Sequence, residues 1–146
     1  MADQVTQTYA THRRYVPTYH FFLALILLLN LIWTVWQLAR NPGGATVIGL
    51  LLAIGLIVLS LHARGFAKSV QDRVIRLEER LRMERLFPPD LKSRIGEFTV
   101  LQLVALRFAS DGELVDLART VLNQPTIGPE DIKKQIKNWR ADFLRA

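Results

Sequence analysis

Two long stretches without a charged side chain limit what this chain can fold into. Between Arg14 and Arg40 lie 25 residues with no formal charge, and between Arg40 and Arg64 lie 23 more. A bilayer core about 30 Å thick is crossed by roughly 20 apolar helical residues, so each stretch is long enough to span it. Backbone N–H and C=O groups in hydrocarbon need internal partners, which predicts that both stretches are helices.

The predicted fold is all-α, a membrane protein whose two transmembrane helices form an antiparallel hairpin. The spans are expected at about 18–38 and 45–63, because "ARNPGGA" (39–45) supplies turn signals for a short connection. The chain is expected to divide into four segments: a cytosolic N-terminal segment (1–16), the hairpin (17–64), a charged amphipathic helix continuing from the second span (65–87) and a small cytosolic module of short helices (88–146).

Basic residues beside the spans predict their orientation. Arg13 and Arg14 precede the first span, whereas the connection carries only Arg40. Several basic residues follow the second span, beginning with Arg64, Lys68, Arg73 and Arg76. Cytoplasmic flanks are enriched in Lys and Arg, so both termini are expected in the cytoplasm, with these residues at the membrane surface.

Polar and small residues inside the spans predict a contact between helices. On the first span the spacing puts three polar residues on one helix face: Asn30, Thr34 and Gln37. On the second span a ridge of small residues permits close approach: Ala45, Gly49, Ala53 and Ser60. These faces either lock the hairpin or dock on another subunit. A substrate path is disfavoured, because neither span contains a charged residue.

Two histidines are the weak candidates for a pigment or metal ligand. His20 and His62 both fall near the cytoplasmic ends of their spans under this topology. The alternative is that each imidazole touches lipid headgroups or caps a helix end. No cofactor is predicted, and a bound lipid or a neighbouring pigment is left open. The chain has no cysteine, which removes thiolate ligands and disulfides.

The charged helix after the second span carries one apolar seam. Its residues repeat at intervals of 4, 3 and 4: Val70, Val74, Leu77 and Leu81. Three interpretations compete. The seam packs on the downstream helices, it joins a coiled coil with another copy or a partner, or it lies on the anionic membrane face. Pro88 and Pro89 are expected to end this helix.

The last sixty residues read as short helices with recognisable caps. Thr99 and Gln102 form one capping box, and Ser110 and Glu113 form a second. Leu101, Val104, Ala105 and Phe108 are expected as the apolar face of the first of these helices. Pro129 is expected to open a last helix, whose apolar face repeats at 4, 3 and 4: Ile132, Ile136, Trp139 and Phe143. So small a core is expected to lean on the preceding helix, the membrane or a partner.

Motifs for catalysis are missing from the sequence. It has no glycine-rich phosphate loop, no H-E-x-x-H and no Ser/His/Asp set supported by its order. The basic segment "IKKQIKNWR" (132–140) could meet phosphates, but nearby acidic residues match its charge and no recognition helix stands out, so nucleic acid is a disfavoured partner.

Three segments carry a resemblance to a known family. "THRRYVPTYHFF" (11–22), "QDRVIRLEERLRMERLFPPDLKSRIGEFTVLQLVALRFASDGEL" (71–114) and "WRADFLRA" (139–146) resemble an uncharacterised family of short, often acidobacterial, membrane proteins. The resemblance implies two spans in a bacterial inner membrane and a cytosolic tail. It implies no activity, substrate or catalytic residue.

The functional hypothesis from the sequence is a non-enzymatic accessory subunit. It would dock on a larger inner-membrane complex, with photosynthetic and respiratory complexes as the analogy. The alternative is a membrane-tethered, homodimeric adaptor or regulator whose cytosolic tail binds a soluble protein or nucleic acid. An enzyme ranks third.

Overall fold

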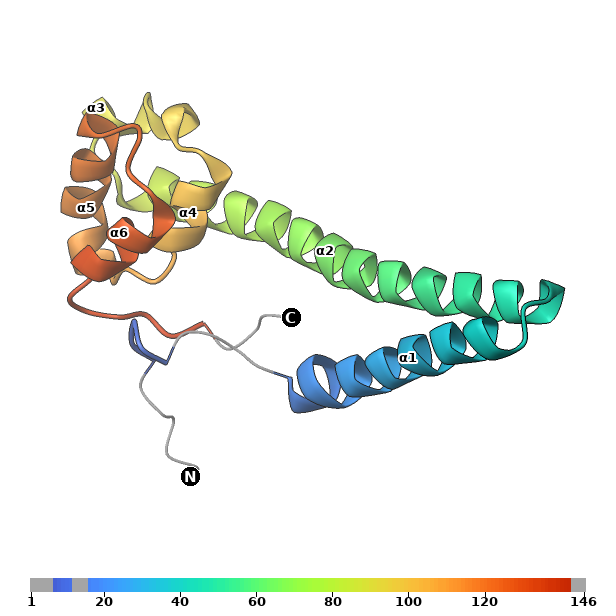
Figure 1. Cartoon of the computed structure of the whole chain (residues 1–146). Coiled ribbons are helices and arrows are strands. Elements are labelled where there is room, and N and C mark those ends of the chain that lie inside the picture. The colour runs from blue at the N-terminus through green and yellow to red at the C-terminus, as the bar shows by residue number, and fades with distance from the viewer. Residues whose placement is uncertain (1–6, 12–15, 143–146) are drawn as a thin grey trace. The chain divides into compact units, whose positions relative to one another are not determined.

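The computed structural model describes residues 7–11 and 16–142, and its regular elements are all helical (Figure 1). In chain order they are η1 (Thr18–Leu23), α1 (Ala24–Arg40), α2 (Gly44–Leu86), α3 (Pro89–Lys92), η2 (Ile95–Glu97), α4 (Val100–Leu106), α5 (Asp111–Asn123) and α6 (Pro129–Gln135). The chain divides into two compact units: Arg14–Ala67, called the helix pair below, and Met1–Arg13 with Lys68–Ala146, called the helical unit.

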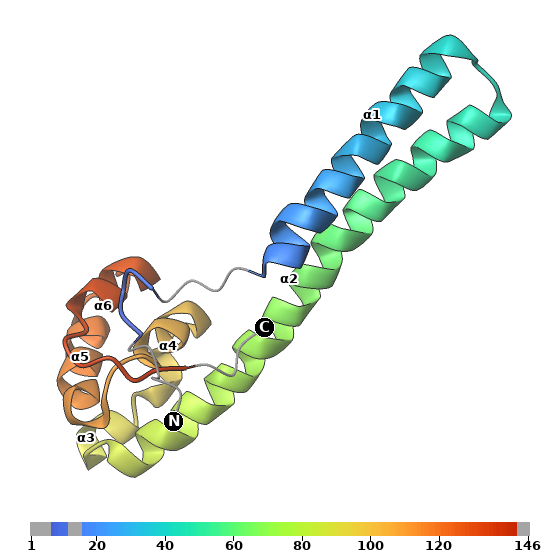
Figure 2. The ribbon, with the colours of Figure 1, turned by 90° about the horizontal axis from the view of Figure 1, so that it is seen from below.

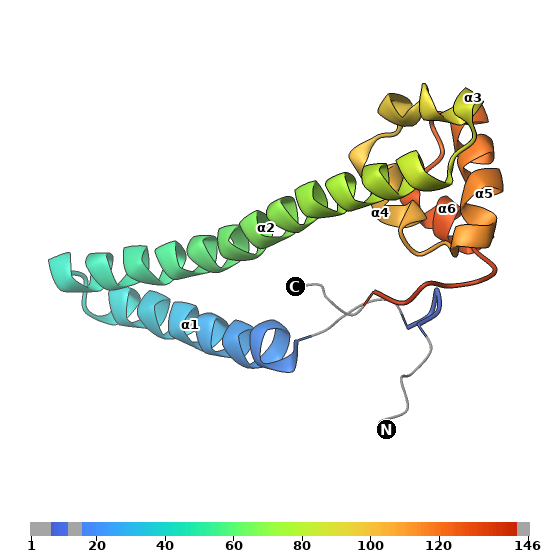
Figure 3. The same ribbon diagram turned by 180° about the vertical axis from the view of Figure 1, so that it is seen from behind.

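The helix pair consists of η1, α1 and the first half of α2, and the ribbon views show α1 lying alongside that half (Figures 2 and 3). Its first helical stretch runs over Thr18–Arg40, two residues longer than the expected 18–38. The turn between the helices is closed by Thr46, whose Oγ1 accepts a hydrogen bond from the Gly43 N–H at 3.0 Å and donates to Asn41 O at 3.0 Å. The turn therefore forms at the residues where the sequence predicts it.

Helix α2 continues without a break for 43 residues, from Gly44 to Leu86. The expected continuation of the second span into a charged helix is confirmed. The helix ends at Leu86, two residues before Pro88, as predicted, because the residue before a proline is disfavoured in the helical region. Pro88 itself is extended, with φ −67° and ψ 161°.

The helical unit has one apolar core, to which α2 contributes Met83 and the following Phe87. Helix α4 packs against α5 and α6, and α5 packs against α6. The fully buried large side chains include Phe108, Leu106 and Leu114. The short helices therefore lean on the end of α2, which is one of the supports that the sequence predicts for so small a core.

Both capping boxes form as predicted. The Thr99 N–H donates to Gln102 Oε1 at 2.9 Å while the Gln102 N–H donates to Thr99 Oγ1 at 3.3 Å. The second box joins Ser110 and Glu113 at the start of α5. The face expected for α4 is partly wrong, because Leu101 is 56% exposed and Gln102 is buried instead. The Gln102 amide is satisfied there, since its Nε2 donates to Pro125 O at 3.0 Å.

The last predicted helix is shorter than its pattern indicates. Helix α6 ends at Gln135, and the chain after it is extended. Trp139 pairs with Ala109 in an isolated antiparallel bridge, and the Arg140 N–H donates to Phe108 O at 2.7 Å. Ile132 and Ile136 are buried as expected. Beyond them, the backbone of residues 138–140 forms hydrogen bonds with residues 108–110 instead of helical hydrogen bonds. Phe143 lies outside the described residues.

Two segments far apart in sequence meet in the helical unit. The Gln7 side chain donates from Nε2 to Asp142 O at 3.2 Å and accepts the Asp142 N–H at 2.8 Å. The Asp142 carboxylate pairs in turn with Arg107 Nε at 3.1 Å. No periodic pattern marks Gln7, so this contact could not be predicted from the sequence.

Candidate interaction surfaces

The side of α1 that contacts α2 contains two of the three predicted polar residues. Thr34 and Gln37 are half-buried, whereas Asn30 is exposed. The Thr34 hydroxyl donates back to its own helix, to Asn30 O and Leu31 O at 3.0 Å each, so it makes no hydrogen bond to α2. On this polar face of α1, the Thr34 methyl group is therefore the part that faces α2. The carboxamide of Asn30 is exposed on the outside of the helix pair.

On α2 three of the four predicted small residues lie toward α1. A Cβ on Gly49 would stand 3.9 Å from Thr34 Cγ2, Ala53 is 2% exposed, and Ser60 is half-buried. Ala45 is exposed. The ridge is therefore an interface between the two helices of the pair over 49–60, and Ala45 lies outside it.

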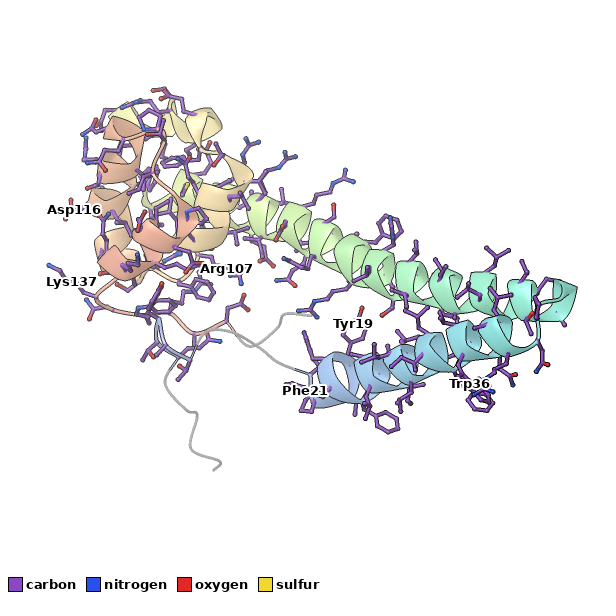
Figure 4. All side chains as sticks on the ribbon, in the orientation of Figure 1. Tyr19, Phe21, Trp36, Arg107, Asp116 and Lys137 are labelled. Carbon is purple, nitrogen blue, oxygen red and sulfur yellow. The ribbon has the colours of Figure 1, made fainter. Side chains whose placement is uncertain are left out.

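The hydrogen bonds between the two helices involve Tyr19, which lies outside the predicted polar face and the predicted ridge of small residues. The Tyr19 hydroxyl donates to Ser60 O, and Ser60 Oγ lies 3.2 Å from the same hydroxyl. Figure 4 shows Tyr19 directed toward α2 and Trp36 directed away from it. The Arg64 guanidinium lies 5.7 Å from the centroid of the Tyr19 ring. The spacing of Tyr19 from Ser60 across the turn was the signal that sequence reasoning missed.

The two histidines are each held by their own helix. His62 Nδ1 lies 2.9 Å from Val58 O, and His20 Nδ1 lies 2.9 Å from Val16 O. The centroid of the His20 ring lies 5.5 Å from that of Tyr19, and the centroid of the His62 ring lies 5.9 Å from that of Phe66. Within the part of the chain that the structure describes, no three His, Cys, Asp or Glu side chains gather as a metal-ligand set.

The predicted membrane-surface basic residues are mostly exposed where they are described. Lys68, Arg73 and Arg76 are exposed, and Arg64 is half-buried against Tyr19. Arg13 and Arg14 lie outside the described residues.

The apolar seam of α2 does not pack on the downstream helices, so that interpretation is wrong. Its four residues are exposed: Val70 by 62%, Val74 by 50%, Leu77 by 61% and Leu81 by 57%. The face that packs carries Ile75, Glu79, Arg82 and Met83, each at most 5% exposed. A hydrophobic repeat did not reveal this face, because two of its members are charged and neutralise each other.

A buried ion cluster joins α2 to the start of α5. Arg82 donates from Nη1 to Glu79 Oε2 at 3.0 Å, from Nε to Asp111 Oδ1 at 2.7 Å and from Nη2 to Ala109 O at 2.7 Å. The Arg82 and Glu79 side chains are each 5% exposed. Arg82 therefore pairs with Glu79 and Asp111, and its side chain is directed toward the core.

Burial raises the pKa of the Glu79 carboxyl above its ordinary value, because loss of water disfavours the charged form. Arg82 opposes this rise in pKa by charge and hydrogen bond, and Arg140, whose Nη1 lies 3.5 Å from Glu79 Oε1, opposes it by charge. The cluster thus combines a desolvated carboxylate with two guanidinium groups.

An open polar cavity of about 320 Å³ borders this cluster and is lined by Arg82, Arg85, Ser110, Asp111 and Arg140. Glu79 and Asp111 already engage Arg82, and Glu79 also faces Arg140. Four of the five lining residues are charged. The lining contains no nucleophile paired with a histidine base.

The extended segment after α6 is fixed by a carboxylate that the sequence marked only as a capping residue. Glu113 Oε1 accepts the Asn138 N–H at 3.1 Å, and Oε2 accepts the Lys137 N–H at 3.2 Å. The capping residue of α5 therefore also positions residues 137–140.

These features define the class as an all-helical protein with two helices long and apolar enough to cross a membrane, followed by a small helical unit. The chain belongs to the family described as DUF6526, a family of unknown function, whose model matches residues 1–146. The resemblance to an uncharacterised family is thereby confirmed. No curated protein and no solved structure matches the chain.

Proposed function

We propose that this protein is a membrane-anchored, non-enzymatic accessory subunit of a larger bacterial inner-membrane complex. In this proposal the helix pair is an antiparallel transmembrane hairpin, and the helical unit lies in the cytoplasm with both termini. The hairpin docks on the complex, by analogy with the small subunits of energy-transducing complexes.

The exposure of the apolar helices is the observation that carries the membrane anchor. In the most apolar window of Thr18–Arg40 no residue is buried, and in that of Gly44–Leu86 only 6% of residues are buried. A core helix of a soluble protein would be covered by the rest of the chain. Soluble monomers rarely expose apolar patches larger than a few hundred Å², so lipid is the surrounding that fits these helices.

The docking role is supported by what the helix pair leaves uncovered. Asn30 is exposed in the middle of α1, although a carboxamide facing lipid alone would lack hydrogen-bond partners. Hydrogen bonds between membrane helices contribute only about 0.6–2 kcal/mol each, so Asn30 serves to select a partner helix more than to hold the fold.

The second candidate function is a membrane-tethered homodimeric adaptor or regulator. The exposed seam of α2 favours this candidate, because it is a row of apolar side chains outside the charge-free spans.

The anchor is tested by fractionation and by topology reporters. After cell lysis and an alkaline carbonate wash, the protein should stay in the membrane pellet, and reporters fused to either end should both report the cytoplasm. Recovery in the supernatant, or reporters on opposite faces of the membrane, would contradict the proposal.

The docking role is tested by extraction in mild detergent at native expression, followed by native gel electrophoresis and mass spectrometry. Migration with a large complex, lost on Asn30→Leu, is expected. Migration of the wild-type protein alone or as a dimer would remove the accessory-subunit proposal and favour the adaptor.

A further inference from the structure

We propose that residues 67–84 of α2 pair with the same residues of a second copy of this chain, forming a parallel two-stranded coiled coil. The starting observation is the seam, whose four side chains are between 50% and 62% exposed on a helix that continues unbroken to Leu86. An apolar row of this kind in water is stabilised when a second surface covers it.

The seam has the spacing of a heptad repeat. Val74 and Leu81 occupy a positions, Val70 and Leu77 occupy d positions, and Ala67 supplies the preceding a position. A β-branched residue at a followed by Leu at d, as in Val74 and Leu77, favours two parallel strands. The next d position is Glu84, which ends the apolar repeat.

The same heptad leaves the packed face of α2 free to keep its contacts. Ile75 and Arg82 take b positions, Met83 takes a c position and Glu79 takes an f position, all on the outer side of a coiled coil. These are the residues that α2 buries in the helical unit. One helix can therefore hold its own helical unit and a second copy of α2 at the same time.

Charges beside the seam favour a second copy as the occupant. In a parallel pair each g residue faces the e residue of the next heptad on the other chain. Arg73 at g would face Glu78 at e, and twofold symmetry repeats this pair. Glu78 is free for it, because Arg82 turns to Glu79 and Asp111. Arg80 at g would face Arg85 at e, which is a like-charged pair. Arg85 lines the same cavity as Asp111, so its charge has an acidic residue nearby.

Parallel pairing of so short a seam rests on the proposed membrane anchor. Two copies anchored in the same orientation send their α2 helices out of the same membrane face. Confinement to a membrane surface also raises the effective concentration of one seam near another, so a short repeat can associate.

Disulfide trapping in the cysteine-free chain tests this pairing directly. In full-length protein in native membranes, Leu77→Cys places a thiol at a d position and Arg76→Cys places one at the neighbouring exposed c position. A disulfide needs Cα atoms within about 7 Å, which facing d positions meet and c positions do not. On mild oxidation Leu77→Cys should give a covalent dimer, and Arg76→Cys should stay monomeric. Equal dimer yields, or no dimer from Leu77→Cys, would overturn the proposal.

Two further measurements identify the partner and the charge pair. Two co-expressed copies with different tags should appear together in the trapped dimer if the occupant is a second copy. In the Leu77→Cys background, Arg73→Glu should lower the dimer yield several-fold, Arg73→Glu with Glu78→Arg should restore it, and the control Arg76→Glu should leave it unchanged. Failure of the double swap to restore the dimer would overturn the charge argument for this occupant.

Membrane fractionation of the same samples separates the two proposals. Protein that stays in the membrane without a Leu77→Cys dimer contradicts only the coiled coil. Protein released into the supernatant contradicts the anchor, and the trapping experiment then still shows whether soluble copies pair. Helical content by circular dichroism confirms that each variant is folded.

Discussion

The helix pair and the helical unit place similar side chains in opposite surroundings. In the helical unit Leu106 and Leu114 are 0% exposed, whereas in the helix pair Leu61 is 68% exposed and Ile48 is 67% exposed. The charged residues are divided in the opposite way, because the two apolar stretches have none and the helical unit buries Glu79 and Arg82. The difference shows that the helical unit makes its own apolar interior, while the helix pair has only one covered side.

The largest expected difference comes from removing an apolar side chain in each region. Phe108 is 1% exposed and its ring centroid lies 5.1 Å from that of Trp139, so Phe108→Ala should cost about 3–5 kcal/mol of unfolding free energy. Leu28 on α1 is 53% exposed, and Leu28→Ala should change the stability of its region by less than about 0.5 kcal/mol.

Amide hydrogen exchange of the full-length protein in detergent measures both effects. Peptides from 100–136 report the helical unit, and peptides from 24–40 report α1. The comparison between the regions breaks down if Leu28→Ala weakens protection in α1 as strongly as Phe108→Ala weakens it in the helical unit.

The buried ion cluster gives the second test. Arg82→Leu leaves the Glu79 carboxylate buried with only the longer contact to Arg140, which should cost about 3 kcal/mol. Adding Glu79→Leu removes the unpaired charge, so the double variant should regain much of that loss. The measurement is exchange protection over 100–136, and Arg76→Leu on the same helix is the control because Arg76 is exposed and does not line the cavity beside the cluster. A double variant less stable than Arg82→Leu would show that the carboxylate is satisfied without Arg82.

A smaller effect is expected where the two helices of the pair meet. A Cβ on Gly49 would lie 3.9 Å from Thr34 Cγ2, so Gly49→Leu forces a larger side chain between the helices and should cost about 1–3 kcal/mol. Gly55→Leu is the matched control, because nothing lies within 4 Å of a Cβ there and the gain in helix propensity is the same. Protection of residues 46–57 measures both. Equal protection in the two variants would show that the small-residue ridge is not an interface.

The sequence was informative where one local signal determines structure. Capping residues located the starts of α4 and α5, and Pro129 located the start of α6. Periodicity failed where contacts distant in sequence decide. It extended α6 toward Phe143, although pairing with residues 108–110 is what holds the chain after Gln135.

Periodicity also misplaced the packed face of α2. The residues with the most regular apolar spacing are the exposed ones, and the buried face contains Glu79 and Arg82. A buried charge becomes compatible with packing only through its partners, and Asp111 and the Ala109 carbonyl come from a segment that is distant in sequence. In the helix pair the same limit applies to Tyr19 and Ser60, which only the turn brings together.

The smallest expected effect separates the regions by pH. Because burial raises the pKa of Glu79 in the folded state, the folded protein binds the proton more tightly than the unfolded chain does. The resulting stability is fully present below the ordinary glutamate pKa of about 4.3 and is lost as the pH rises through the folded pKa. The slope in that window is at most about 1.4 kcal/mol per pH unit for one proton. Protection factors over 100–136 should therefore fall across it, and Glu79→Gln should flatten the fall. Residues 46–57 carry no titratable side chain, so their protection should stay constant over the same range. A fall of equal size in Glu79→Gln would assign the titration to another carboxyl of the helical unit, while a fall over 46–57 would mean that the helix pair does not unfold independently of it.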